Sequence, residues 1–229
     1  MKIDDKKIEK ITSEIKNSRY IETFKTWNKV AVLYAQKFMD LQLYDETYDV
    51  FCNLMKKKNA AVLEIGCGPG NISKYLLSKR PDFDILGIDI APNMIKLAKK
   101  NNPSAQFKLM DSRDIDTLTT KFDAIICGFC LPYLSDIDRL KLISDCKKLL
   151  SKNGILYISF VEGKYKNSDY QVGSKGSDRV FFYYHELKFL EAELKKYDFE
   201  LISIINIDYN LSVKTERHTV VIVQKKNNK

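Results

Sequence analysis

Residues 61–71 of the 229-residue chain read AVLEIGCGPGN, in which three glycines alternate with other residues directly after a short apolar run. The glycines are Gly66, Gly68 and Gly70, and the carboxylate of Glu64 precedes them. Glycine adopts positive φ at little cost and lets a ligand contact bare backbone. A helix that begins there adds unpaired N–H groups and partial positive charge. The pattern predicts a turn that holds an anionic or nucleoside-bearing ligand, although a tight turn without any ligand would show the same glycines.

Two further carboxylates follow the next two predicted strands. Asp89 ends the strand in GIDIAPNM, and Asp111 ends the strand in FKLMDSRD. The carboxyl ends of parallel strands meet at one edge of a sheet, so both acids should lie beside the glycines. A carboxylate after the second strand can bind both hydroxyls of a ribose, and one after the third can accept from an exocyclic amine. Either could instead cap a helix, but together they predict a nucleoside site.

The elements that must position these residues begin near residue 59. Short apolar runs alternate with amphipathic segments through residues 61–161, which predicts β-α units with helices on both faces of a parallel sheet. Two final strands, FELISIINI and HTVVIVQKK, are joined too closely for a covering helix and should pair antiparallel. We therefore expect an α/β, Rossmann-like sheet of seven mostly parallel strands with an antiparallel final strand. Residues 1–58 read as a helical cap or lid, and residues 59–229 as the ligand-binding domain.

Local signals place the ends of several elements. Pro92 suits the first position of a helix, and Ser135 with Asp138 makes a capping box. Gly154 is expected to end the helix that Ser135 begins. The segment EGKYKNSDYQVGSKGSDR is polar and contains three glycines, so it reads as a long loop, and HELKFLEAELKKY after it reads as a helix.

Over residues 60–229 the sequence resembles the class I S-adenosylmethionine-dependent methyltransferases, whose signature is an acidic residue followed by G-x-G-x-G. Glu64, the three glycines, Asp89 and Asp111 match that pattern by position. The resemblance implies that the backbone of 66–70 meets the methionine portion of S-adenosylmethionine and that Asp89 holds the ribose. It also implies that Ile90 packs on the adenine and that Asp111 with the Ser112 backbone contacts the adenine edge. The stretch Cys127–Phe129 of the fourth strand would face the sulfonium. The residues expected at the cofactor are Tyr34, Glu64, Gly66, Cys67, Gly68, Gly70, Asp89, Ile90, Asp111, Ser112 and Cys127.

The sequence looks most like the small-molecule members of that family. It lacks N/D-P-P-Y after the fourth strand, where Cys127-Gly-Phe-Cys130 stands instead, and it has the A-x-x-Y pattern at Ala31–Tyr34. This implies in-line methyl transfer to a small-molecule acceptor, with a base needed only if the acceptor carries a proton that must leave. The aromatic residues of the cap could close over the cofactor and shape the acceptor pocket, or simply pack on the sheet.

The candidate catalytic residues are Tyr133, which the family pattern places at the substrate, and His185. His185 follows FFYY at the end of the polar loop, so it could be a general base at the pocket mouth or an ordinary helix cap. His218 opens the last strand and is a weaker candidate. Cys127 and Cys130 have C-x-x-C spacing, but no second cysteine pair or histidine cluster completes a zinc site, so no metal is expected.

Other functions stay open at this point. A nicotinamide-dependent oxidoreductase would need G-x-G-x-x-G, but position 71 is Asn. A non-catalytic cofactor-binding subunit, or the same fold acting on RNA or protein, would carry the same motifs. Each of these is separable by cofactor binding, turnover or salt-dependent RNA binding.

The composition of the chain limits which kinds of partner it can have. The net charge is +8, but lysine supplies most of the 38 basic residues, and arginine stands at only six positions. Because nucleic-acid recognition relies on the arginine fork, we read the charge as solvated surface and expect no nucleic-acid partner. Five scattered cysteines indicate reduced thiols. No apolar run reaches the ~18–20 residues that span a bilayer, and the charged N-terminus is no secretory signal. We expect a soluble cytoplasmic monomer or homodimer.

Overall fold

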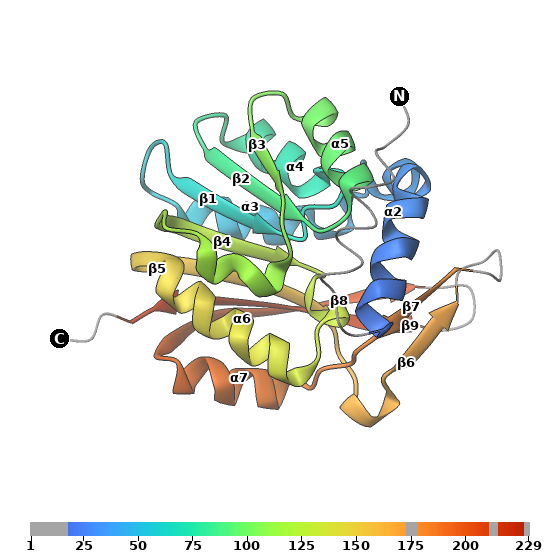
Figure 1. Ribbon diagram of the computed structural model, residues 1–229. Coiled ribbons are helices and arrows are strands. Elements are labelled where there is room, and N and C mark those ends of the chain that lie inside the picture. The colour runs from blue at the N-terminus through green and yellow to red at the C-terminus, as the bar shows by residue number, and fades with distance from the viewer. Residues whose placement is uncertain (1–17, 173–177, 211–214, 227–229) are drawn as a thin grey trace.

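A seven-stranded sheet forms the centre of the described part of the chain, residues 18–172, 178–210 and 215–226 of a computed structural model (Figure 1). Its strand order is β3-β2-β1-β4-β5-β9-β8. The first five strands in this order are parallel, and β9 pairs antiparallel with both β5 and β8. The predicted Rossmann-like sheet with an antiparallel final strand is therefore confirmed. The sheet strands are β1 Ala61–Ile65, β2 Asp84–Asp89, β3 Gln106–Leu109, β4 Phe122–Gly128, β5 Leu150–Val161, β8 Phe199–Asn210 and β9 Thr215–Lys225.

Helices cover both faces of this sheet because the buried strands carry apolar side chains on both sides. In β1, Val62 packs in one apolar cluster with α3 and α4, while Leu63 and Ile65 pack in another with α6 and α7. Figure 1 shows α6 and α7 on the face opposite α3 and α4. Two buried layers thus fix the register of each central strand. The helices are α2 Ser18–Phe38, α3 Asp45–Leu54, α4 Asn71–Lys79, α5 Pro92–Asn101, α6 Asp136–Leu149 and α7 Leu187–Lys196, with short 3-10 turns η1 Gln42–Tyr44, η2 Ser112–Thr117, η3 Leu131–Tyr133 and η4 Tyr165–Asn167.

The start of α6 forms one half of the predicted capping box. The Ser135 side chain accepts from the backbone N–H of Asp138, and the Ser135 hydroxyl donates to the Asp138 carboxylate. Tyr20, in α2, joins this cap: its hydroxyl donates to Asp138 and accepts from the Ser135 backbone N–H at 3.0 Å. The cap therefore also ties α2 to the main domain. Pro92 begins α5, as predicted.

The expected end of α6 at Gly154 is wrong. The helix ends at Leu149, and β5 begins at once with Leu150. Asn153, with φ +58°, takes the left-handed conformation instead. A side chain at Gly154 would place its Cβ 2.9 Å from Leu150 Cδ2 and 3.0 Å from the Ser151 carbonyl. This glycine is therefore required for close packing inside a bend, which composition alone does not distinguish from a helix cap.

The segment read as a long loop contains a hairpin. β6 Asp169–Val172 and β7 Arg179–Phe182 pair antiparallel beside α2, and residues 173–177 between them lie outside the described residues. The backbone N–H of Phe181 donates to the Thr23 hydroxyl at 3.1 Å, and the Thr26 hydroxyl donates to the Arg179 carbonyl at 2.7 Å. The pairing is thus supported by α2, a segment about 150 residues away in the sequence, and no local pattern could predict it.

The described part of the N-terminal segment is helical, as predicted, and its first 17 residues lie outside the description. α2 lies beside α5 and β7 (Figure 1). Asn28 in α2 accepts from the Asn93 backbone N–H at 2.9 Å, and the Asn93 amide donates back to the Asn28 carbonyl at 2.7 Å. Within the described ranges, no helix combines the length and the apolar character that spanning a bilayer requires.

Candidate functional site

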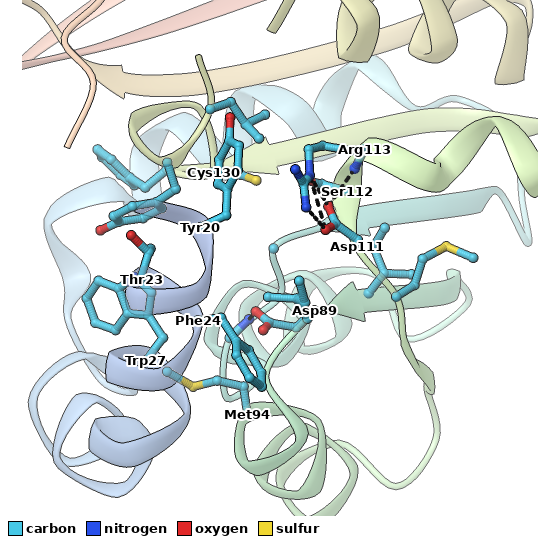
Figure 2. A pocket seen from close by; sticks show the side chains of 18 of the residues that line it. Tyr20, Thr23, Phe24, Trp27, Asp89, Met94, Asp111, Ser112, Arg113 and Cys130 are labelled. Carbon is cyan, nitrogen blue, oxygen red and sulfur yellow. Dashed lines mark hydrogen bonds and ion pairs between the residues drawn. The ribbon is translucent and has the colours of Figure 1, made fainter. Parts of the chain in front are cut away.

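A cavity of about 930 Å³, counted to its open mouth, lies where the carboxyl ends of β1, β2 and β4 meet α2. Figure 2 shows side chains from α2 on one side and Asp89 and Asp111 on the other. Of the residues expected at the cofactor or substrate, the lining includes Tyr34, Gly66, Gly68, Asp89, Ile90, Asp111, Ser112 and Tyr133. The sequence did not single out Tyr20, Thr23, Phe24, Trp27, Met94, Met110, Arg113 and Leu134, which also line it, as does Cys130 of the C-x-x-C segment.

Two of the three glycines face the cavity, and both need their type. Gly66 has φ +70° and Gly68 has φ +52°, values that other residues rarely adopt. A Cβ on Gly66 would also come within 3.1 Å of the Cys130 Cβ. A Cβ on Gly68 would meet nothing closer than the Tyr34 ring at 3.7 Å. Backbone conformation therefore favours glycine at 68, and both conformation and space favour it at 66.

Gly70 and Cys67 do not line the cavity, which corrects the contact expected for both. A Cβ on Gly70 would lie 2.4 Å from the Asn102 amide nitrogen, which donates to the Gly70 carbonyl at 2.9 Å. The Cys67 side chain is buried against Ile95 of α5 and Phe107 of β3, and its N–H donates to the Ile88 carbonyl. These two positions serve the packing of α5 under the turn.

Asp89 is held by the backbone through both oxygens. Its Oδ2 accepts from the Gly68 N–H at 2.9 Å, and its Oδ1 accepts from the Ala91 N–H at 2.8 Å. Burial raises the pKa of this carboxyl to about 6, and the two backbone hydrogen bonds oppose the rise. The group is therefore mostly ionised at neutral pH, and each oxygen keeps a further acceptor position. An acceptor pair fixed in this way suits two neighbouring hydroxyl groups.

Asp111 is already engaged by an arginine. Arg113 Nη2 lies 2.5 Å from Asp111 Oδ2, Nε lies 3.0 Å from Oδ1, and the Arg113 backbone N–H also donates to Oδ1. The Arg113 guanidinium in turn sits 4.2 Å from the centre of the Tyr20 ring. The pair places opposite charges together at the cavity wall, so a ligand amine at Asp111 would share the carboxylate with Arg113.

Aromatic rings form the wall that α2 contributes. The Trp27 ring packs edge-on against Tyr34 and against Tyr133, each at 5.4 Å between ring centres. Burial raises the pKa of Tyr133 far above its usual range, so this hydroxyl stays neutral. The Trp27 indole N–H is buried and has no hydrogen-bond partner among the described residues. A ligand in the cavity could satisfy this donor, and ring faces favour a cationic ligand.

Glu64 lies beneath the glycine turn and does not line the cavity. Its Oε2 accepts from the Ser73 hydroxyl, while Oε1 is buried and has no hydrogen-bond partner within the described ranges. Burial raises the pKa of this carboxyl to about 8, and hydrogen bonds from Ser73 oppose the rise. Glu64 is therefore mostly protonated at neutral pH and supports the turn from below as a neutral group.

The expected position of Cys127 is wrong. Its side chain is fully buried in the apolar cluster that includes Cys146 of α6, because alternation along β4 turns it toward that face. The cavity is lined by the next three residues, Gly128, Phe129 and Cys130, of which the first two belong to the stretch expected there.

His185 is also misplaced by the sequence reasoning. It is buried and absent from the cavity lining. Its Nε2 donates to the Leu131 carbonyl at 2.9 Å, so Nδ1, 3.0 Å from Arg139 Nη1, must accept from that guanidinium. Burial lowers the pKa of the imidazole to about 4. Both ring nitrogens hold structural partners, which contradicts the expected base at the pocket mouth.

Comparisons with known proteins agree with this architecture. Residues 62–154 match the family model described as a methyltransferase domain. A putative methyltransferase 235L of Invertebrate iridescent virus 6 is 30% identical over 138 residues, which is 60% of this chain and 49% of that protein. A malonyl-[acyl-carrier protein] O-methyltransferase of Acetivibrio thermocellus is 27% identical over 66% of this chain and 50% of that protein. The chain thus spans about half the length of these curated relatives.

A solved structure shows the same fold over nearly the whole chain. The N-methyltransferase NodS from Bradyrhizobium japonicum, crystallised with S-adenosyl-L-homocysteine, superimposes with a TM-score of 0.67 over 90% of this chain and 100% of that one, at 15% identity. The strand order, the glycine turn at the end of β1 and the match over residues 62–154 together identify a methyltransferase domain in this chain, with the fold of the solved N-methyltransferase.

Proposed function

We propose that this protein binds S-adenosylmethionine in the cavity and transfers the methyl group to a small molecule by in-line displacement. The observation that carries the proposal is the placement of Asp89, whose two oxygens are anchored by the Gly68 and Ala91 N–H groups directly beside the glycine turn. The match of residues 62–154 to a methyltransferase domain supports the same cofactor.

The lining residues fit the parts of that cofactor. Asp89 would accept from the ribose hydroxyls, and the bare backbone at Gly66 and Gly68 leaves room for the methionine portion. Ile90 and Met110 offer apolar surface for the adenine ring. Asp111 and Ser112 would meet its polar edge. When bound, the cofactor supplies an electrophilic methyl group, and this chain's residues hold it in line with the acceptor and exclude water.

The helical segment 1–58 is proposed as a lid over residues 59–229. Its described part supplies Tyr20, Phe24, Trp27 and Tyr34 to the cavity wall. The hydrogen bonds of Tyr20 and Asn28 to the main domain hold α2 in place over the cofactor.

A small-molecule acceptor is proposed in preference to RNA or protein. The first support is that α2 forms one wall of the cavity. The second is that, among the described residues, the only charged side chains in the lining are those of Asp89, Asp111 and Arg113. The cytoplasmic location that we propose rests on the sequence, in which five scattered cysteines indicate reduced thiols. A monomer or homodimer remains our expectation for the assembly.

Calorimetric titration of the full chain tests the cofactor. We expect S-adenosylmethionine and S-adenosylhomocysteine to bind one site per chain, and NAD⁺ at the same concentration to give no heat. Folded protein that takes up neither adenosyl compound would overturn the proposal. Binding of NAD⁺ in their place would favour the oxidoreductase alternative.

A further inference from the structure

A second, smaller hollow, which is open to solvent, adjoins the first between the helical segment and the end of β4. The two cavities share Tyr34, Gly66, Gly68, Gly128 and Phe129 in their linings. These shared residues lie where the proposed function places the methionine portion and its sulfonium. The second cavity, here called the acceptor chamber, is therefore in position to hold the molecule that receives the methyl group. The inference below rests on that proposed function.

The residues that line the acceptor chamber are uncharged and many are aromatic, but the surface that they present to it is more polar than apolar. Phe38, Tyr44 and Tyr48 come from the helical segment, and Phe129 comes from the end of β4. The remaining lining residues are glycines, Tyr34, Leu41, Ile72 and a single amide, Asn71. A chamber of this kind suits a flat, neutral, aromatic molecule, because burying a charged one without a partner is costly.

Phe129 holds an unusual backbone conformation at the boundary of the two cavities. Its φ is +53°, which a bulky residue rarely adopts. Its N–H lies 3.1 Å from the Ser159 carbonyl and 3.0 Å from the Ser159 hydroxyl, which keep it in place. The ring lies 5.0 Å from the Tyr44 ring and 5.0 Å from the His218 ring. Strained backbone of this kind concentrates at functional sites.

Tyr44 connects the acceptor chamber to a buried histidine. The Tyr44 hydroxyl lies 2.7 Å from His218 Nδ1, and the two rings are nearly parallel, at 11°. On the other nitrogen, His218 Nε2 lies 3.7 Å from Glu216 Oε2, is buried, and has no hydrogen-bond partner among the described residues. The three groups form a row from the chamber wall through β9 to a carboxylate that is 19% exposed.

Tyr44 and His218 are both uncharged before an acceptor binds. Burial raises the pKa of Tyr44 and lowers the pKa of His218, whereas Glu216 opposes the latter shift. Tyr44 is therefore a neutral phenol that donates to an unprotonated Nδ1. In the described part of the chain, the titratable side chains that face the imidazole are Tyr44 from η1, Tyr209 from β8 and Glu216 from β9 itself. The imidazole is free to receive one proton.

We propose that Tyr44, positioned by His218 and Glu216, removes the proton from an aromatic hydroxyl group bound in the acceptor chamber. The acceptor O–H bond breaks, its proton goes to the Tyr44 oxygen, and the Tyr44 proton goes to His218 Nδ1. The acceptor oxygen forms its bond to the methyl carbon while the carbon–sulfur bond breaks and leaves its electron pair on sulfur. The positive charge thus moves from the sulfonium to an imidazolium beside Glu216, which passes the proton on to solvent.

If the hydrogen bond between Tyr44 and His218 served only the packing of the fold, its loss would affect all phenols equally. Packing does not depend on the acidity of the acceptor hydroxyl. Tyr44→Phe keeps the ring and removes the hydroxyl. Tyr75→Phe is the matched control, since the Tyr75 hydroxyl binds Asp49 on the helical surface and lies outside the acceptor chamber. Phenol and 4-nitrophenol serve as probes at mildly alkaline pH, where the second is largely ionised and the first is not.

With the full chain and S-adenosylmethionine, we expect wild type to methylate both phenols. Tyr44→Phe should lower kcat for phenol by about 100-fold or more, the usual size of general-base effects. It should lower kcat for ionised 4-nitrophenol less than about tenfold, with unchanged cofactor affinity and with Tyr75→Phe like wild type. His218→Asn should remove the fall of kcat for phenol at acid pH. Equal losses with both phenols, or none, would overturn the proposal.

A binding measurement gives a readout without turnover. In the presence of S-adenosylhomocysteine and at the same pH, wild type should bind 4-nitrophenol with a larger ionised fraction than Tyr44→Phe does, which the absorption spectrum of the bound compound measures. Wild type that binds S-adenosylhomocysteine but neither ionises nor methylates a phenol refutes the proton-removal row alone. Protein that binds no adenosyl compound refutes the proposed function as well.

Discussion

Replacing Asp89 by asparagine exchanges one carboxylate oxygen for an N–H donor at nearly constant size. In the structure each oxygen faces a backbone N–H, from Gly68 or Ala91, so the amide nitrogen would point at a donor whichever way it turned. The ribose would also lose one of its two expected acceptors. A hydrogen bond to a charged group contributes about 1.5–3 kcal/mol. We therefore expect Asp89→Asn to weaken S-adenosylhomocysteine binding by about 10- to 150-fold.

Calorimetry at pH 7.5 measures this difference, and Asp84→Asn, an exposed position at the start of the same strand, is the control. Because the pKa of Asp89 is about 6, wild-type affinity should also decline as the pH falls through that value. The asparagine variant should lack the decline, since it has no group to protonate. Equal affinity of Asp89→Asn and wild type at pH 7.5, with both proteins folded, would refute the assignment of Asp89 to the ribose.

Three other substitutions test the elements around the site. Gly68→Val should abolish cofactor binding, because a β-branched residue does not tolerate φ +52°. If calorimetry showed that the folded variant still binds the cofactor, the proposed role of the turn would be contradicted. Glu64 has a pKa raised to about 8, so its contribution to stability is fully present below its usual pKa near 4.5 and is lost as the pH rises through 8. Glu64→Gln should reduce the fall in unfolding free energy between pH 5.5 and 8.5, by roughly 3 kcal/mol at most. Urea titrations that show the same fall in both proteins would reject this. Tyr20→Phe removes the hydrogen bonds to Ser135 and Asp138. It should destabilise α2 by about 1–3 kcal/mol, which would be measured as faster hydrogen exchange in α2 alone. Unchanged exchange would mean that other contacts hold the helix.

Local sequence was sufficient for the order and type of most elements. Apolar runs of strand length, helix periodicity and the acids after β2 and β3 follow rules that act over a few residues. The cavity residues contributed by the strand ends, such as Gly66, Gly68 and Asp89, were therefore predicted, since parallel strands bring their carboxyl ends to one edge whatever the details of packing. The final antiparallel pair followed from the short connection between its strands.

The directions of side chains were decided by tertiary packing. Cys127 and His185 point into the buried layers because α6 and the loop before α7 pack there, and one residue of register turns a strand side chain from one face to the other. The α2 wall with Trp27, the Arg113–Asp111 pair and the contact of Tyr44 with His218 join residues from different elements. Sequence alone determined the turn and the acids at the sheet edge. Only the folded chain determined which aromatic and polar groups close around them, because such contacts depend on how distant surfaces meet.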